Sequence, residues 1–190
     1  MPVSSEVRPV RSARDWAQVR ALVQAYASSL GVDLGFQGFD VEIADLERSY
    51  ARPGGMWLAV RRGAALGCVG LRALGEGRGE LKRLYVVEEA RGSGAGRALV
   101  QAALTSARRA GFRAVRLDTL PEMEAAQALY RALGFRPIEP YRVNPVPGAA
   151  FLELELSPGP RPGDPRPRPS PRRGAGRPRA RRPPAGRGRR

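Results

Sequence analysis

Three glycines alternate with small residues between two arginines in the segment ARGSGAGRAL, residues 90–99. A backbone without Cβ atoms can approach another molecule closely. The residues that follow have helical periodicity, and the free N–H groups at the start of a helix bind anions. The segment therefore predicts either a phosphate-binding loop or a flexible turn between a strand and a helix. The glycines are Gly92, Gly94 and Gly96, and the arginines are Arg91 and Arg97.

The segment matches a dinucleotide-binding fingerprint only in part, and it does not match a P-loop. Gly92-x-Gly94 matches the start of a dinucleotide-binding fingerprint, and Asp118 stands near the end of the next expected strand. Arg97 occupies the position of the third glycine, however, so this match is partial. A P-loop is excluded because no Gly-Lys-Ser/Thr follows the glycines.

The residue types that are missing narrow the chemistry further. Histidine is absent, which excludes Ser-His-Asp and Cys-His catalysis and histidine-ligated metal sites. Cys68 is the only cysteine, so internal disulfides and multi-thiolate zinc sites are excluded too. Cys68 lies in an apolar run with strand character, where we expect it to be a small buried residue. We expect no metal cofactor.

The hydrophobic pattern predicts a mixed α/β chain. Helical spacing and period-two alternation indicate the order β-α-α-β-β-β-α-β-α-β-β, with no internal repeat. The segment before the glycine loop, the helix after it and the next strand form one βαβ unit, so those two strands should be parallel. The expected strands are 6–10, 56–60, 65–74, 80–87, 112–120 and two around NPVPGA, and the expected helices are 12–31, 39–52, 97–111 and 121–135.

The charge is concentrated in the last 33 residues. Residues 158–190 hold 12 Arg, 10 Pro and 6 Gly, with no aliphatic side chain larger than alanine, which predicts a disordered tail after a globular domain at 1–157. Such a tail could bind nucleic acid or another polyanion weakly and without sequence specificity, although it lacks aromatic residues for base stacking. The sequence shows no secretory or membrane-spanning segment, so we expect a cytoplasmic protein that does not bind membranes.

Two motifs resemble the GNAT (Gcn5-related) N-acetyltransferase superfamily. Arg91-x-x-Gly94-x-Gly96, after a strand ending LYVV, is similar to the Arg/Gln-x-x-Gly-x-Gly/Ala of its motif A. AAQALYRALGF, 125–135, resembles the family's Ala-x-x-x-Tyr-x-x-x-Gly-Phe element, and the resemblance covers roughly residues 5–157. It implies a GNAT-like acyltransferase fold, with a mixed, mostly antiparallel sheet of about seven strands and flanking helices. It also implies direct transfer of an acetyl group from acetyl-CoA to a primary amine.

The resemblance implies which residues hold acetyl-CoA. N–H groups of the glycine loop would wrap the pyrophosphate at a helix N-terminus, where the dipole favours negative charge. The pantetheine arm would lie like an extra strand beside the strand before the loop. Met123 departs from the family pattern, because many members have a cofactor-contacting Asn there. The expected cofactor-binding residues are Leu84, Tyr85, Val86, Arg91, Gly92, Ser93, Gly94, Ala95, Gly96 and Arg97.

Acetyl transfer needs a base for the amine, a donor for the carbonyl oxygen and an acid for the thiolate. The resemblance implies Glu80 as the base, a backbone N–H near Val86 as the oxyanion donor, and Tyr130 as the acid. Each has another interpretation, because Glu80 could be a surface acid and Tyr130 a core aromatic. Asp118 is a second candidate for the base or for binding the amine, and water alone is a third possibility.

The acceptor and the partners stay open at this point. Phe36, Phe39 and Tyr141 could line an acceptor pocket or anchor the core. The acids Asp33, Asp40 and Glu42 could attract a cationic amine or cap and solvate a helix. A homodimer is possible, and a CoA-binding regulatory module without catalysis is an alternative function.

Overall fold

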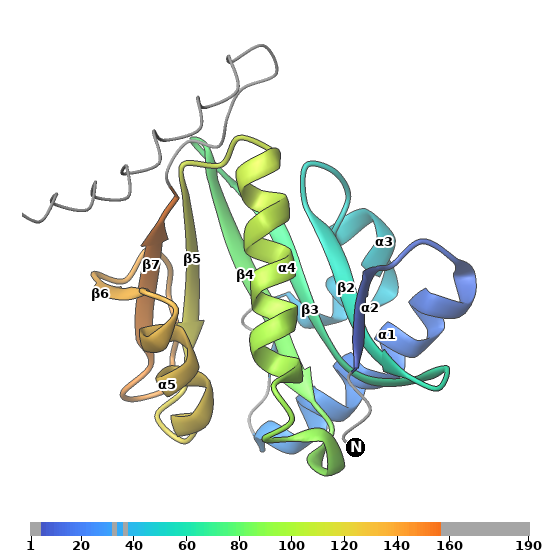
Figure 1. Cartoon of the computed structure of the whole chain (residues 1–190). Coiled ribbons are helices and arrows are strands. Elements are labelled where there is room, and N and C mark those ends of the chain that lie inside the picture. The colour runs from blue at the N-terminus through green and yellow to red at the C-terminus, as the bar shows by residue number, and fades with distance from the viewer. Residues whose placement is uncertain (1–4, 32–33, 36–37, 157–190) are drawn as a thin grey trace, which may run out of the picture. The chain divides into compact units, whose positions relative to one another are not determined.

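The computed structural model describes residues 5–31, 34–35 and 38–156, so predictions on Asp33, Phe36 and the segment 158–190 fall outside it. Seven strands form one sheet in the order β1-β2-β3-β4-β5-β7-β6 (Figure 1). Among the described strands, β4 and β5 pair in parallel and the other neighbours pair antiparallel, which confirms the predicted fold class. The strands are β1 (Glu6–Pro9), β2 (Gly55–Arg61), β3 (Ala64–Gly75), β4 (Arg78–Val86), β5 (Ala114–Thr119), β6 (Arg136–Ile138) and β7 (Ala150–Glu155).

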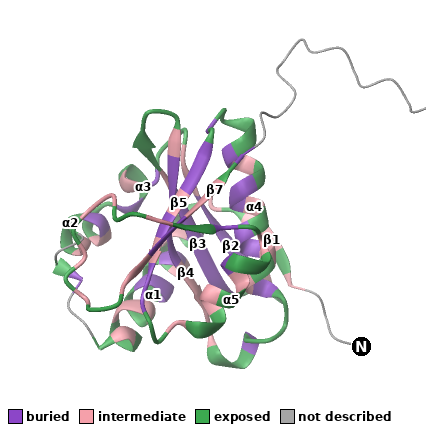
Figure 2. Cartoon of the chain, turned by 90° about the vertical axis from the view of Figure 1, so that its left-hand side faces the viewer, coloured by how far each residue is buried: buried purple, intermediate pink, exposed green. Residues whose placement is uncertain are grey.

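Helices cover both faces of the sheet, and two apolar clusters fill the space between the layers. α4 (Ala95–Arg109) and α5 (Glu124–Ala132) lie on one face, whereas α1 (Ala13–Leu30), α2 (Phe39–Ala44) and α3 (Leu46–Ser49) lie on the other (Figure 1). The cluster under α4 includes Leu99 and Val115, and the cluster under α1 includes Val23 and Cys68. Cys68 is fully buried, as expected. The central strands are accordingly the most buried part of the chain (Figure 2).

One predicted helix is wrong in its extent. The segment 39–52 forms two short helices, α2 and α3, because Asp45 leaves the helical region at φ −140° and ψ 76°. The Asp45 carboxylate then accepts a hydrogen bond of 3.0 Å from the Arg48 N–H and so caps α3. The pattern of apolar residues continues across this break, which is why periodicity alone does not reveal it.

An extra residue in β4 changes which side chains face which layer. Cys68 pairs with Tyr85 and Gly70 pairs with Lys82, so one residue of β3 stands opposite two residues of β4. Arg83, one of those two, has φ 57°, in the left-handed region. Such a bulge shifts the alternation by one residue. Leu81 and Leu84 consequently pack on the α4 side although they are three positions apart.

Candidate active site

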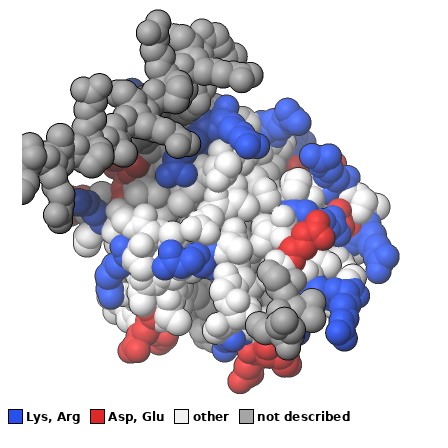
Figure 3. Space-filling model, viewed as in Figure 1, with Lys and Arg blue, Asp and Glu red and all other residues white. Residues whose placement is uncertain are grey.

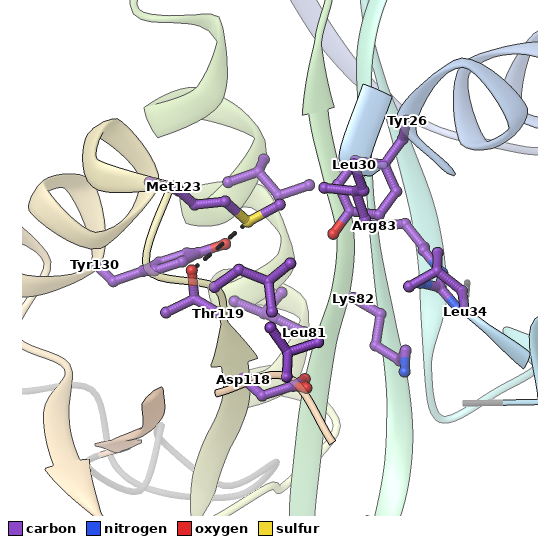
Figure 4. A pocket seen from close by; sticks show the side chains of 14 residues that line it. Tyr26, Leu30, Leu34, Leu81, Lys82, Arg83, Asp118, Thr119, Met123 and Tyr130 are labelled. Atoms are coloured by element: carbon purple, nitrogen blue, oxygen red, sulfur yellow. Dashed lines mark hydrogen bonds between the residues drawn. The ribbon is translucent and has the colours of Figure 1, made fainter. Parts of the chain in front are cut away.

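The sheet opens between β4 and β5. Their ladder has three pairs, from Arg78↔Ala114 to Glu80↔Arg116, and within the described residues it extends no further. The strands therefore diverge beyond Glu80 and leave a narrow pocket (Figure 4). Its walls come from both faces of the sheet, and they include Tyr26, Leu30, Leu34, Leu81, Lys82, Arg83, Leu84, Asp118, Thr119, Leu120, Met123, Ala126, Tyr130 and Val146.

The glycine loop leads from β4 into α4 through a short 3₁₀ turn, η2 (Glu88–Ala90). Gly92 and Gly94 have φ of 74° and 87°, a conformation that favours glycine. A Cβ at either position would point into open space, with no atom of the described residues within 4 Å. Gly96 is different, because it is already in α4 and its Cβ would make ordinary contacts of 3.7 Å with Leu129 and Val86.

The first turn of α4 has little capping from side chains. Its N-cap is Gly94, which has no side chain to accept the first N–H groups. The Ser93 hydroxyl donates to the Ala90 carbonyl at 2.6 Å and accepts a long 3.4 Å bond from the Ala95 N–H. Arg97 is exposed in this turn. The start of α4 thus presents N–H groups and a positive dipole end to an anion.

Arg91 lies between the loop and β4. Its Nε donates a 3.3 Å hydrogen bond to the Val86 carbonyl, which fixes the guanidinium beside the last residue of the strand. Leu84, Tyr85 and Val86 are half-buried on the stretch of β4 that has left β5. The structure thus brings the predicted pantetheine-binding stretch, the loop and Arg91 into one continuous surface.

Tyr130 reaches the pocket from α5. Its ring packs edge-to-face on Phe135 at a centroid distance of 5.6 Å, and its hydroxyl points toward Thr119 and Met123 (Figure 4). Burial raises the pKa of Tyr130, which keeps the phenol protonated at neutral pH. Met123 lines the same wall, and its sulfur accepts a 3.7 Å hydrogen bond from the Thr119 hydroxyl. Both interpretations of Tyr130 are compatible with this position, since it packs in the core and faces the pocket.

Glu80 is fully buried at the point where the β4–β5 ladder ends. Its Oε2 accepts a 2.7 Å bond from Arg72 Nε, and its Oε1 accepts a 2.9 Å bond from the Tyr141 hydroxyl. Arg142 Nη1 lies 3.4 Å from the same Oε1. Both carboxylate oxygens are therefore engaged, and Glu80 is not a surface acid. Tyr141 binds this carboxylate instead of lining the pocket.

The segment between β6 and β7 is tied to Asp118 on β5. Asp118 accepts hydrogen bonds from Arg142 Nη2 and, at 2.8 Å, from Asn144 Nδ2. The Asn144 side chain also accepts the Val146 N–H at 3.0 Å, and Val146 lines the pocket. Asp118 consequently holds one wall of the pocket in position, in addition to lining it.

Glu42 and Arg83 form a buried pair between α2 and the bulge of β4. Arg83 Nε and Nη2 each donate a 2.8 Å bond to one oxygen of Glu42, and the Tyr50 hydroxyl donates to the first oxygen at 2.6 Å. The guanidinium also lies 5.1 Å from the centroid of the Phe39 ring. Glu42 and Phe39 therefore fix α2 to β4, whereas Asp40 is exposed.

Lys82 is a pocket residue that the sequence interpretation missed. Its side chain is buried, with 6% exposure, and leaves β4 on the wall across from Tyr130 and Met123 (Figure 4). Burial, together with the charges of Arg83, Arg72 and Arg142, lowers the pKa of Lys82 to about 7, against the opposing effect of Glu80. A signal was present in the composition, because Lys82 is the only lysine among the 33 basic residues of the chain.

Comparisons with known proteins agree with this geometry. The model of the acetyltransferase (GNAT) family matches residues 18–135. An uncharacterized N-acetyltransferase of Schizosaccharomyces pombe is 38% identical over 157 residues, which cover 81% of this chain and 96% of the relative. Together with these matches, a sheet that opens beside a glycine loop and a helix N-terminus places the protein among the acyltransferases. The chain belongs to the GNAT acetyltransferase family.

Solved structures show the same fold. A GNAT acetyltransferase from Staphylococcus aureus superposes with a TM-score of 0.69 at 18% identity, over 81% of this chain and all of that chain. A Salmonella typhimurium protein solved with its cofactor acetyl-CoA superposes with a TM-score of 0.61 at 19% identity, over 82% of this chain and 95% of that chain.

The described residues also show how charge is distributed on the surface, whether metal-ligating side chains cluster and whether a helix could span a membrane. Lys and Arg side chains on the face in Figure 3 form separate groups around an uncharged centre. Within the described ranges, no three metal-ligating side chains come together. In the same part of the chain, the helices are too short or too polar to cross a bilayer.

Proposed function

We propose that the protein transfers the acetyl group of acetyl-CoA directly to a primary amine of a small molecule, a peptide or a protein. The observation that carries this proposal is the weakly capped start of α4, with open space at Gly92 and Gly94, next to the stretch of β4 that has left β5. A pyrophosphate fits the first feature and an extended amide-containing arm fits the second.

Different residues on this surface bind the phosphates, the extended arm and the thioester of acetyl-CoA. N–H groups from Gly92 to Arg97 face the phosphates, and Arg91 and Arg97 supply positive charge. Backbone groups of Leu84, Tyr85 and Val86 pair with the arm. The Val86 N–H is the proposed donor to the carbonyl oxygen, and Tyr130 the proposed acid for the sulfur. That Glu80 is the base stays a prediction, since Arg72, Tyr141 and Arg142 already bind its carboxylate.

The wider organisation of the chain is part of the same proposal. We place the catalytic domain at residues 1–157 and treat 158–190 as a separate basic tail, in a cytoplasmic protein that uses no metal. The tail's arginines favour weak, salt-dependent contacts with polyanions. Homodimer formation is compatible with this organisation. A catalytically inactive CoA-binding module is the alternative function, and it would bind acetyl-CoA without acetylating any amine.

Calorimetric titration of the full chain with acetyl-CoA tests the proposal. We expect micromolar binding, weaker binding of dephospho-CoA, and no binding of NAD. In the Gly94→Trp variant, an indole occupies the open space at the start of α4, and we expect binding to be lost.

Gly111→Trp is the matched control for the backbone effect of this substitution. Gly111 also has a positive φ, 80°, and open space around its Cβ, but it follows the opposite end of α4. Equal loss of binding in both variants, or no heat with the unchanged protein, would contradict the proposed cofactor site. Binding without release of CoA thiol in the presence of any amine would instead favour the inactive module.

A further inference from the structure

The chain uses arginine at every basic position except one. Of its 33 basic residues, 32 are arginines, and the single lysine is Lys82, inside the pocket. Arginine binds carboxylates and phosphates better than lysine does, because its planar guanidinium forms paired hydrogen bonds. Lysine differs from arginine because its amine can lose its proton when it is buried, whereas a guanidinium stays protonated. A lysine at this position alone therefore indicates proton chemistry more than anion binding.

Lys82 lies on the same face of β4 as Glu80, two residues earlier, and both precede the bulge at Arg83. Glu80 is closer to the intact part of the sheet, where three side chains hold its carboxylate. Lys82 is one pleat further on, where the strands have separated, and it lines the pocket itself. Of the two, Lys82 is therefore better placed to meet an acceptor.

We propose that Lys82 is the proton acceptor for the incoming amine. Glu80 is then a positioning residue, which orients the part of β4 that carries Lys82 and the segment after β6. The inference rests on the proposed acetyl transfer and names a catalytic residue for it. The acid and the base then come from opposite walls of the pocket, Tyr130 from the α5 side and Lys82 from the α1 side.

The protons balance in this arrangement. An acceptor ammonium gives one proton to the neutral Lys82 amine, which later releases it to solvent. The freed amine attacks the thioester carbonyl, and the C–S bond breaks as the new C–N bond becomes an amide. A second proton leaves the attacking nitrogen, and the sulfur is protonated by Tyr130, whose hydroxyl regains that proton. The third proton stays on the amide nitrogen.

The charges around Lys82 are compatible with an amine that is neutral near pH 7. Burial and the cations Arg72 on β3, Arg83 on β4 and Arg142 after β6 lower its pKa to about 7, while Glu80 acts in the opposite direction. A base is most effective when its pKa lies near the working pH. The pocket is also lined by the titratable groups of Asp118 on β5, Tyr26 on α1 and Tyr130 on α5. Glu42 on α2 and Tyr141 after β6 bind the neighbours of Lys82, Arg83 and Glu80.

A nuclear magnetic resonance titration tests the inference without any acceptor. Protein labelled with [ε-¹³C]lysine gives one lysine signal, because the chain has one lysine. We expect this signal to titrate with a pKa near 7, with and without acetyl-CoA. The variant Arg108→Lys adds an exposed lysine in the last turn of α4, whose signal should titrate at the ordinary value of about 10.4. A pKa of Lys82 above about 9.5 overturns the inference.

Kinetics distinguish a base from an anion-binding cation. The assay follows release of CoA with L-aspartate, spermidine and the tripeptide Ala-Ala-Ala, and it uses the amine turned over fastest. We expect Lys82→Met and Lys82→Arg to lower kcat/KM by about 100-fold or more, since proton transfer contributes effects of that size. Both variants should also lose the rise of kcat/KM with pH near neutrality. If Lys82→Arg keeps kcat/KM within about threefold, the residue is not a base and the inference fails.

Two further results would also overturn it. Intact-mass and peptide analysis after incubation with acetyl-CoA should show no acetyl group on Lys82, because accumulation there would make it an acceptor. Loss of the acidic limb of the pH profile in Glu80→Gln, with that limb retained in Lys82→Met, would return the role to Glu80. If Glu80→Gln does not fold, Tyr141→Phe takes its place in the comparison of pH profiles with Lys82→Met, because it removes one hydrogen bond to Glu80.

Calorimetry separates failure of this inference from failure of the proposed function. The Lys82 variants should bind acetyl-CoA within about threefold of the unchanged protein, since the side chain lies apart from the glycine loop. Absence of binding in every protein would contradict acetyl transfer itself. Normal binding together with an ordinary lysine pKa would contradict the role of Lys82 alone. If none of the amines is turned over, the nuclear magnetic resonance titration alone tests the role of Lys82. A Lys82 pKa near 7 supports that role, and a pKa above about 9.5 overturns it.

Discussion

Replacement of Glu42 by glutamine tests the link between α2 and the bulge of β4. Glu42 and Arg83 have side-chain exposures of 3% and 2%, and two hydrogen bonds of 2.8 Å join them. In Glu42→Gln the Arg83 guanidinium keeps its place in the core but faces a neutral amide, and the Tyr50 hydroxyl loses a charged acceptor. We expect a large loss of stability without a large change in the shape of the site.

The magnitude follows from the burial of the pair. Removal of one partner from a buried ion pair costs about 3–5 kcal/mol, because the remaining charge is left without compensation. At about 2–4 °C per kcal/mol for a domain of this size, the expected decrease in Tm is about 6–20 °C. Addition of Arg83→Met removes the remaining charge, so the double variant should lose less than the two single losses added together.

The pH dependence has a defined sign. Burial alone would raise the pKa of Glu42, but the hydrogen bonds and charge of Arg83 outweigh it, and the net shift is downward. A carboxyl whose pKa is lowered by folding adds stability above its unfolded value of about 4.3, and this is lost as the pH falls through the folded value. The difference between the unchanged protein and Glu42→Gln should therefore be full at pH 7 and decrease in strong acid.

Urea denaturation followed by the fluorescence of Trp16 and Trp57 measures the free energy of unfolding. Asp40→Asn is the matched control, because Asp40 is an exposed acid on the same helix and its replacement should change stability by at most about 0.5 kcal/mol. A loss below about 1 kcal/mol in Glu42→Gln, or equal losses in the two variants, would refute the assignment of this pair as the anchor of α2.

Two further substitutions probe the catalytic wall and the loop. Tyr130→Phe keeps the packing on Phe135 and removes the hydroxyl, so thermal stability should hold while turnover falls about tenfold or more; a decrease below about threefold would contradict the acid role. Gly96→Ala should stabilise the protein to urea by up to about 1 kcal/mol, because its Cβ would have room at 3.7 Å from Leu129 and Val86 and alanine favours helix. Acetyl-CoA affinity should stay within a few-fold by calorimetry, and a large loss would mean that ligand approaches closer to this backbone than proposed.

Local patterns predicted the elements that build the site. Glycine spacing and periodicity located the turn from β4 into α4, where Gly92 and Gly94 have the positive φ that favours glycine. These features depend on a few adjacent residues, so the sequence contains them directly. The family resemblance added the mixed, mostly antiparallel sheet of about seven strands, and it also gave the expected roles of Glu80 and Tyr130.

Contacts between distant segments could not be predicted in this way. Nothing near Glu80 in the sequence indicates that Tyr141, 61 residues away, donates to it, or that Glu42 meets Arg83 across 41 residues. The bulge at Arg83 was equally hidden, because a non-glycine residue at φ 57° has no sequence signature. Lys82 was missed because one basic residue in a strand suggests a solvated edge, and its position beside the pocket depends on where the strands separate.

The short β4–β5 ladder gives the sheet a seam. Three residue pairs of the backbone ladder join β1–β4 to β5, β7 and β6, so side chains supply most of the contact between the two groups of strands. These side chains include Leu81 and Val115 in the cluster under α4, and Tyr141, which donates to Glu80. Acetyl-CoA bound at the proposed surface would contact both groups of strands. We therefore expect it to slow amide exchange in both groups. Release of CoA at the end of a turnover should then restore the faster amide exchange of the ligand-free protein.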